Sequence, residues 1–264
     1  MTDSSRAAGH CRFDRRIIML NGKNAVITGA NRGIGRAIVE KYAENGANVW
    51  ACARSFSESF EKDMAQLAEK YGIWIKPVYF DLSDSNAVAG GMKEIFSDKL
   101  PVDILVNNAG VAHGALFTMT SLETLRQVYE VNVFAQVQIM QLCARKMMRQ
   151  NGGCIINMCS IGGINTDPGY LAYGSSKAAL IWITKSVSKE LGRYNIRVNG
   201  IAPGLIDTDM GIYKSPEELE KVRKKMSLDR TGKPEEVAEA AVYIASDKAS
   251  YMTGHILVLD GGRQ

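Results

Sequence analysis

Ser160, Tyr173 and Lys177 are the side chains of this sequence whose types and spacing could do chemistry. Tyr173 and Lys177 are four residues apart, so on a helix they lie on one face. An ammonium group that close favours the ionised phenol and draws its pKa from about 10 toward neutrality. Such a phenol can give a proton to an alkoxide or take one from an alcohol, while the Ser160 hydroxyl holds the same substrate oxygen. The trio therefore predicts carbonyl reduction or alcohol oxidation beside a hydride carrier; the alternative is that Tyr173 only packs on a half-buried helix.

A glycine-rich turn near the start of the chain could hold that carrier. It follows the apolar run 24–27 and precedes an amphipathic helical pattern that ends at Gly46. Glycines let the backbone approach a pyrophosphate, and the helix N-terminus supplies free N–H groups and positive potential. The pattern predicts a dinucleotide cradle made of Gly29, Asn31, Arg32, Gly33, Ile34 and Gly35.

Two arginines indicate which dinucleotide is bound. NAD sites commonly place an acid at the end of the second strand, where it holds the ribose hydroxyls. Here the strand-like run 48–53 is followed by Arg54, and Arg32 lies inside the glycine turn. Two guanidinium groups suit a 2′-phosphate, so we expect NADP(H) as the cofactor. The alternative is that both arginines are simply solvated.

The rest of the chain alternates strands with helices, which predicts an α/β fold. Apolar strand-like runs occupy 24–27, 48–53, 78–80, 104–106, 154–156, 196–201 and 255–259. Helical patterns lie between them, including one long apolar helix at 122–148, the Tyr173 helix at about 170–191, and a helix that begins at Pro234. We expect a single doubly wound Rossmann domain over residues 19–264, with a seven-stranded parallel sheet and helices on both faces. Residues 1–18 are expected to be a flexible tail, or Met19 the true initiator, and 205–226 a mobile lid.

Composition limits the other classes of function. The 264 residues are 46% hydrophobic and 23% charged, as in ordinary globular proteins. Net charge is +4, but the first twenty residues hold four Arg against two Asp, so the body carries only +2. That argues against nucleic-acid and membrane partners. Five cysteines without metal-ligand spacing indicate reduced thiols, no metal and a cytoplasmic location: Cys11, Cys52, Cys143, Cys154 and Cys159.

Taken together, these motifs resemble the short-chain dehydrogenase/reductase family over residues 19–262. The resemblance is carried by Thr28-Gly29 … Gly33-Ile34-Gly35, Asp81, Asn107-Asn108-Ala109-Gly110, Asn132, Ser160, Tyr173 … Lys177 and Pro203-Gly204 … Thr208. Within the family the chain looks most like the 3-oxoacyl-[acyl-carrier-protein] reductases, because Asn31–Ala37, Ala202–Met210 and Thr253–Gly262 also fit them. Sugar, polyol and hydroxysteroid dehydrogenases share these pieces.

The resemblance implies a role for each matching residue. Ser160 would orient the carbonyl, Tyr173 would donate the proton, and Lys177 would grip the nicotinamide ribose and lower the Tyr173 pKa. Asn132 would hold a water in a relay to Lys177. The cofactor would also be bound by Asp81 and Leu82 at the adenine, Asn108, Ala109 and Gly110 at the adenosine ribose side, and Pro203, Gly204, Ile206 and Thr208 near the carboxamide.

The implied activity is NADP(H)-dependent reduction of a ketone, with a 3-oxoacyl thioester favoured, to a secondary alcohol. A sugar, polyol or hydroxysteroid dehydrogenase is the alternative. A regulator without chemistry would not need Asn132, Ser160, Tyr173 and Lys177 together, and a sugar-nucleotide epimerase would need more chain after the last strand.

We expect the substrate wall to come from residues 113–117, the turn 162–168 and the lid, with contacts from Ser160, Tyr173, His113, Gly162, Leu205 and Met210. This mostly apolar mixture favours a neutral or acyl substrate. His113 near the carbonyl could act as a second acid, but we favour the alternative that it is a surface-loop imidazole. By resemblance, the outer faces of the two long helices would form a homotetramer. Basic residues near the carrier-docking places of the family are Arg149 and Arg193, but Asn151 and Tyr194 occupy the matching positions.

Overall fold

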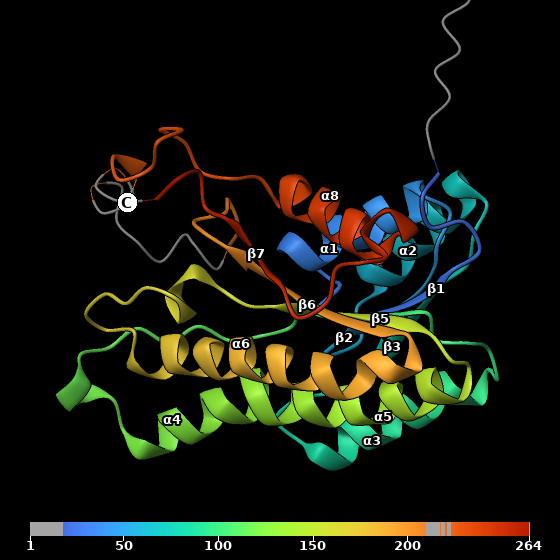
Figure 1. Cartoon of the computed structure of the whole chain (residues 1–264), viewed down its shortest axis with the longest axis horizontal. Helices are drawn as coiled ribbons and strands as arrows, with labels where there is room; N and C mark the ends of the chain where they lie inside the picture. Colours follow the sequence, from blue (N-terminus) through green and yellow to red (C-terminus); the bar gives the residue numbers. More distant parts are fainter. Residues whose placement is uncertain (1–17, 210–216, 218–219, 221–222, 264) are drawn as a thin grey trace, which may run out of the picture.

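Seven parallel strands form the centre of the molecule. The computed structural model describes residues 18–209, 217, 220 and 223–263. The strands lie in the order β3-β2-β1-β4-β5-β6-β7 (Figure 1). Their bounds are β1 Asn24–Thr28, β2 Asn48–Ala53, β3 Ile75–Tyr79, β4 Ile104–Asn107, β5 Gly153–Met158, β6 Ile196–Pro203 and β7 Ile256–Leu259. The predicted α/β fold with a seven-stranded parallel sheet is confirmed.

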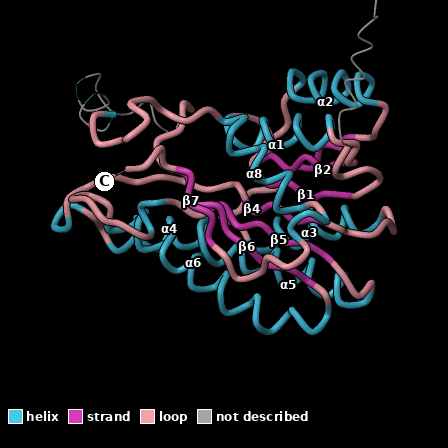
Figure 2. The backbone as a smooth tube through the Cα atoms, turned by 45° about the horizontal axis from the view of Figure 1, so that its top comes forward, coloured by secondary structure: helices cyan, strands magenta, loops and turns pink. Residues whose placement is uncertain are grey.

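Helices cover both faces of the sheet. Figures 1 and 2 show α1, α2 and α8 on one side and α3, α4, α5 and α6 on the other. Their bounds are α1 Gly33–Glu44, α2 Glu58–Tyr71, α3 Ser85–Ser97, α4 Leu122–Tyr129, α5 Ala135–Arg149, α6 Leu171–Leu191 and α8 Pro234–Ala245. Short 3-10 turns lie at Phe117–Met119, Ile161–Gly163, Gly192–Tyr194 and Asp247–Ala249. No helix in this described part of the chain is both long and apolar enough to span a bilayer.

The core is split by the sheet into two layers, as the strand side chains require. Alternate residues of a strand point to opposite faces, so Ile27 packs with the α1 and α8 side while its neighbour Val26 packs with the α3 and α5 side. Both are fully buried. Strands buried on both faces read as continuous apolar runs, which is why the sequence pattern locates them so directly.

The long helix predicted at 122–148 is broken in the structure. It consists of α4, a π-helical turn at Glu130–Phe134, and α5. A π turn inserts one extra residue into the helical repeat and often occurs at functional sites. Here it contains Asn132, which is completely buried. Apolar periodicity cannot detect such a turn, because the buried stripe continues on either side of it.

The order in which strands are added to the sheet reverses between β1 and β4. β1 pairs with β2 on one side and with β4 on the other, with Ile27 opposite both Ala51 and Val106. The connections that follow β1 and β4 therefore turn toward opposite faces of the sheet, and a crevice opens between them at the carboxyl ends of the two strands. The glycine turn and the segment after Asn107 meet there.

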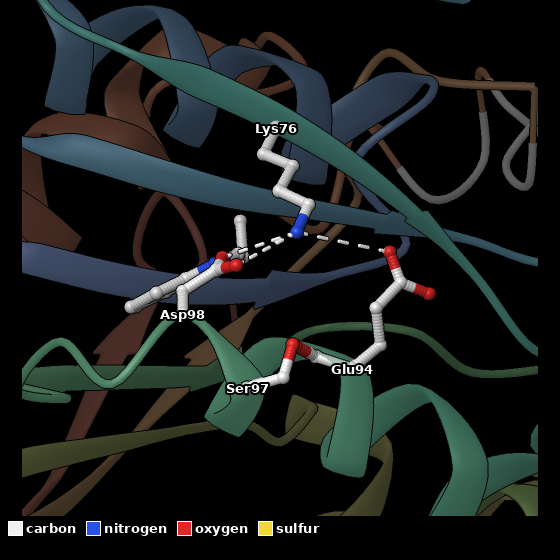
Figure 3. Close-up of polar contacts among 5 residues, drawn as sticks. Lys76, Glu94, Ser97 and Asp98 are labelled. Carbon is white, nitrogen blue, oxygen red and sulfur yellow. Dashed lines mark hydrogen bonds and ion pairs between the residues drawn. The ribbon is translucent and has the colours of Figure 1, made fainter.

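A polar cluster ties the end of α3 to β2 and β3 at the end of the strands away from this crevice. The Asp98 carboxylate accepts hydrogen bonds from Trp50 Nε1 at 2.8 Å and from Lys76 Nζ at 2.9 Å, and the same ammonium lies 4.0 Å from Glu94. Figure 3 shows Lys76 reaching from its strand toward Asp98 and Glu94, at the end of α3. These bonds lower the pKa of Asp98. The cluster ties the C-terminus of α3 to β2 and β3.

Candidate active site

A cavity of about 400 Å³ opens at the carboxyl ends of the strands. It runs from the glycine turn to the start of α6. Of the residues predicted for catalysis or binding, those that line it are Gly29, Asn31, Arg32, Gly33, Ile34, Gly35, Arg54, Asp81, Leu82, Asn108, Ala109, Gly110, Ser160, Gly162, Tyr173, Lys177, Pro203, Gly204, Leu205, Ile206 and Thr208. The segments that follow β1 to β6 and the start of α6 thus meet in one pocket.

Ser160, Tyr173 and Lys177 share one wall of this cavity. Tyr173 and Lys177 lie one turn apart near the start of α6, and Ser160 follows β5 directly. The Ser160 Oγ accepts a hydrogen bond from the Gly162 backbone N–H at 3.0 Å, which fixes the side chain at the start of the 3-10 turn. The hydroxyl lies within hydrogen-bonding reach of the Tyr173 side chain and can also turn its hydrogen toward a ligand oxygen.

The expected lowering of the Tyr173 pKa by Lys177 is not found. Burial raises the pKa of Tyr173 above its ordinary value, and the Ser160 side chain opposes that shift. The Lys177 ammonium donates to the Met158 carbonyl at 2.8 Å and lies 5.9 Å from the centroid of the Tyr173 ring. Burial also lowers the pKa of Lys177 to about 8. The prediction counted one nearby charge and left out the desolvation of both groups.

Asn132 does not line the cavity but lies directly behind it. Its Nδ2 donates to the Val111 carbonyl at 2.9 Å and to Ser176 Oγ at 3.0 Å, and its Oδ1 accepts from the Val111 N–H at 2.9 Å. Both amide hydrogens therefore have protein partners. A Cβ on Gly110 would lie 3.1 Å from Asn132 Oδ1 and 3.4 Å from Lys177 Nζ, so a side chain here would crowd both groups.

The glycine turn fits the pyrophosphate of a nicotinamide dinucleotide. Gly29 and Gly33 have φ of +65° and +53°, which other residues rarely adopt. A Cβ on Gly35 would lie only 2.0 Å from the Gly29 carbonyl oxygen. The N-terminus of α1 has no side-chain cap and no acid in its first turn. Its backbone N–H groups are therefore available to an anion.

Asn108 and Thr28 hold the glycine turn against the end of β4. Asn108 Nδ2 donates to the Thr28 carbonyl at 3.0 Å and to the Gly29 carbonyl at 3.3 Å. Thr28 Oγ1 accepts from the backbone N–H groups of Asn108 and Ala109, each at 3.0 Å. The Asn108 side chain thus supports the cradle from behind, and only its amide oxygen has no bond to the turn.

The two predicted arginines line the cavity from the glycine turn and from the end of β2. Arg54 is exposed and follows Ala53 at the end of β2. The Arg32 guanidinium lies 3.4 Å from the Asp209 carboxylate, and both side chains are about 70% exposed, at 71% and 68%. Such an exposed pair is weak. Hydrogen bonds from the Ser83 backbone and hydroxyl lower the pKa of Asp81, which therefore presents a charged carboxylate here.

One predicted residue is not found on the wall of the cavity. His113 does not line it, although the neighbouring Val111 and Ala112 do. Met210 and half of the expected lid lie outside the described residues, as does nearly all of the expected tail. Leu205, Ile206 and Thr208 mark where the lid segment leaves the site, and a Cβ on Gly33 would lie 3.3 Å from Thr208 Cγ2.

The structure also adds wall residues that the sequence reasoning missed. Tyr170 lines the cavity, and its ring meets the Tyr173 ring edge-on with centroids 6.3 Å apart. Its position three residues before Tyr173 on one helix face could have suggested this. Arg263 also lines the cavity and pairs with Asp167, which the predicted turn 162–168 does include. No local pattern in the sequence connects Arg263 with the site.

A doubly wound parallel sheet with a glycine turn and a serine, tyrosine and lysine on its carboxyl edge defines a nicotinamide-dependent oxidoreductase. Residues 29–264 match the family model described as enoyl-(acyl carrier protein) reductase. The chain is 38% identical to the 3-oxoacyl-[acyl-carrier-protein] reductase of Aquifex aeolicus over 245 residues, 93% of this chain and 98% of the relative. It belongs to the short-chain dehydrogenase/reductase family.

Solved structures agree in fold and differ in substrate. A 7α-hydroxysteroid dehydrogenase complexed with NADH and 7-oxo glycochenodeoxycholic acid superposes with a TM-score of 0.87 at 33% identity, covering 94% of this chain and 96% of its own. The L-sorbose reductase of Gluconobacter frateurii complexed with NADPH and L-sorbose gives 0.88 at 31%, with 94% and 98% covered. The family uses NAD(P)H, and its members reduce small carbonyl compounds of several classes.

Proposed function

We propose that the protein is an NADP(H)-dependent reductase that converts a ketone, preferably a 3-oxoacyl thioester, to a secondary alcohol. The observation that carries this proposal is the placement of Ser160, Tyr173 and Lys177 in the cavity that begins at the glycine turn. Packing alone does not explain a buried lysine there, because burying an ammonium group costs free energy that an apolar side chain in the same place would not.

In the proposed mechanism Ser160 and Tyr173 act on the same substrate oxygen, and Lys177 and Asn132 support them. The nicotinamide, when bound, supplies the hydride. Ser160 donates a hydrogen bond to the carbonyl oxygen, and Tyr173 gives its proton to the same oxygen as it becomes an alkoxide. Lys177 stabilises the phenolate that remains, and it would also hold the nicotinamide ribose when the cofactor is bound. A water relay behind Lys177 would use the backbone of Asn132 or its Oδ1, since both Nδ2 hydrogens are already bonded.

The cofactor preference rests on Arg32 and Arg54. Both are largely exposed and line the cavity, Arg32 in the glycine turn and Arg54 after β2, where the second ribose of a dinucleotide would lie, and β2 ends without an acid. We expect NADPH to bind at least about tenfold more tightly than NADH, which is about 1.4 kcal/mol. Fluorescence titration of both nucleotides checks this, and Arg54→Gln should remove most of the difference. Equal affinities for the two nucleotides would contradict it.

The substrate class is tested with a panel of ketones. NADPH consumption is measured with a short 3-oxoacyl thioester, a keto sugar, an oxo-steroid and a small cyclic ketone. Fastest turnover of the thioester supports the proposal, whereas preference for the steroid or the sugar favours the second candidate, a hydroxysteroid or sugar and polyol dehydrogenase. The solved relatives of those two kinds motivate that candidate. No turnover with any ketone would contradict both.

We also propose an assembly, a cellular location and a pathway for the protein. We infer a cytoplasmic homotetramer, with 1–18 as a tail outside the catalytic domain 19–264, and a place in fatty acid synthesis if the thioester is the substrate. Arg149 and Arg193 are exposed and suit an acidic carrier protein. The Arg193 guanidinium lies 4.8 Å above the Tyr194 ring, which keeps it near the end of α6.

A further inference from the structure

An ion pair closes part of the cavity wall near Tyr170. The Arg263 guanidinium donates to the Asp167 carboxylate, with side chains 14% and 40% exposed. Both residues line the cavity that Ser160 and Tyr173 line. They come from distant segments, the turn between β5 and α6 and the end of the chain after β7. Figures 1 and 2 show the chain after β7 running to the end of the molecule where α6 begins.

The backbone at Arg263 is held in place by the segment 226–228. Ser227 donates to the Gly262 carbonyl from its backbone at 3.3 Å and from its hydroxyl at 2.9 Å, and Leu228 N donates to the Gly261 carbonyl at 3.1 Å. Met226 and Arg263 form an antiparallel bridge. The guanidinium therefore projects from a fixed backbone and not from a loose end.

A short run of contacts connects this pair to Tyr173. The Tyr170 backbone N–H donates to the Asp167 carbonyl at 3.3 Å, and the Tyr170 ring packs edge-on against the Tyr173 ring. The other charged lining residues lie elsewhere: Lys177 is beside Tyr173, and Arg32, Arg54, Asp81 and Asp209 belong to the glycine turn, the β2 and β3 ends and the segment after Thr208. In the described part of the chain, Arg263 and Asp167 are thus the charged side chains of the substrate wall.

The guanidinium has more donors than Asp167 uses. An arginine has five N–H groups in a planar fork, and within the described residues Asp167 is its hydrogen-bond acceptor. A largely buried cation is costly to keep, and its remaining donors favour an oxygen ligand. A plain apolar substrate would leave those donors unmatched.

We propose that Arg263 is a specificity-determining residue that binds a second oxygen of the substrate, a carbonyl or carboxylate oxygen distinct from the carbonyl that is reduced. This inference rests on the proposed function, since it assumes that a ketone occupies the cavity. Asp167 orients the guanidinium and balances its charge. The preferred substrates are therefore ketones with a second oxygen a few bonds away.

The test compares three ketones of matched length: a plain ketone, a 3-oxo ester and a keto acid. In Arg263→Gln we expect KM for the oxygen-bearing ketones to rise about tenfold or more, because a charge-assisted hydrogen bond is lost. KM for the plain ketone and the affinity for NADPH should not change, and Arg263→Lys should restore part of the loss. The ester and the acid distinguish a carbonyl from a carboxylate. Arg230→Gln is the matched control, because Arg230 pairs with Glu236 away from the cavity.

A second variant and a second readout keep the inference separable from the proposed function. Asp167→Asn keeps an oxygen that can orient the guanidinium but removes the negative charge that repels a substrate carboxylate. Binding of the keto acid should therefore tighten in Asp167→Asn and weaken in Arg263→Gln, whereas a purely structural ion pair would give losses in both variants. Calorimetric titration with the corresponding hydroxy ester and hydroxy acid measures binding without turnover. If the wild type reduces no ketone, the proposed function fails while these titrations still test Arg263. Unchanged affinities in Arg263→Gln, or equal losses for all three ketones, would overturn the inference.

Discussion

Tyr173 is the side chain on which the proposed chemistry depends. Its hydroxyl lies in a half-buried position beside Ser160, and burial holds its pKa above the ordinary value. The phenol is therefore protonated at neutral pH and able to act as an acid. A raised pKa makes the proton harder to give up, so Lys177 and the hydrogen bond to the substrate oxygen must assist at the moment of transfer.

Replacing Tyr173 with Phe removes only this proton donor. We expect kcat/KM for ketone reduction to fall about 10²–10⁴-fold, the usual contribution of a positioned acid. The affinity for NADPH should stay nearly unchanged, since the ring remains. Steady-state kinetics and fluorescence titration measure the two quantities. Tyr251→Phe, at a fully exposed position, is the control, and full activity in Tyr173→Phe would end the mechanism.

The burial of Lys177 should make the free energy of unfolding depend on pH. Burial lowers its pKa to about 8 from a reference value of 10.5, so between these values the unfolded chain binds the proton that the folded chain has lost. Stability contributed by this group therefore rises with pH across that window, by up to about 1.4 kcal/mol per pH unit. Urea unfolding of the wild type and Lys177→Met at pH 7.5 and 9.5 should show the wild type gaining relative to the variant.

The control for this measurement is Lys185→Met, an exposed position on the same helix. Its free energy of unfolding should follow the wild type at both pH values. Parallel curves for Lys177→Met and the wild type would mean that the lysine keeps its ordinary pKa in the folded protein.

At the scale of elements, the π-helical turn supports the site, whereas the polar cluster around Asp98 supports only the fold. The turn at Glu130–Phe134 directs the Asn132 amide toward the segment after β4 and toward α6, so it couples three elements behind the site. The cluster around Asp98 (Figure 3) lies away from the cavity and only fastens α3 to the sheet. A change in the cluster should therefore alter stability without altering the chemistry.

Asp98→Ala tests this separation. Trp50 is fully buried, and its indole N–H would lose its partner, which costs about 1–3 kcal/mol. We expect the free energy of unfolding to fall by that amount, while kcat stays unchanged below the melting transition. Glu94→Ala is the matched control, because its 4.0 Å contact with Lys76 is exposed and contributes little. Equal stability of the two variants would contradict the role given to Asp98.

At the scale of the whole molecule, two large aromatic side chains stay exposed on α6 and beside the start of α5 in the single chain. Trp182 is 74% exposed, and Phe134, at the junction of the π turn with α5, is 56% exposed. Large exposed side chains of this kind on neighbouring helices are typical of subunit interfaces. They support the proposed homotetramer.

Sedimentation velocity checks the assembly. We expect the wild type to sediment as a tetramer and Trp182→Glu to sediment as a smaller species, because burying an unpaired carboxylate opposes association. Gln66→Glu, at an exposed position of α2 on the other side of the sheet, adds the same single negative charge and leaves the tryptophan in place, so it controls for the change in charge. A wild type that sediments only as a monomer would contradict the proposal.

The sequence by itself determined the features that depend on local spacing. The strand–glycine turn–helix unit, the four-residue spacing of Tyr173 and Lys177, and the alternation of apolar runs with helical patterns predicted the family and the seven-stranded sheet, and both are confirmed. These features are readable because a buried parallel strand needs a continuous apolar run and a phosphate cradle needs glycines.

Tertiary structure decided what depends on desolvation and on contacts between distant segments. It raised the pKa of Tyr173 where the spacing alone suggested lowering, because burial outweighs a lysine whose ammonium is bonded to the Met158 carbonyl. It left His113 out of the cavity wall. It also brought Arg263, which follows Asp167 by 96 positions in the sequence, into an ion pair with that residue. No local pattern encodes such an encounter, since only the folded sheet brings the end of β7 to the start of α6.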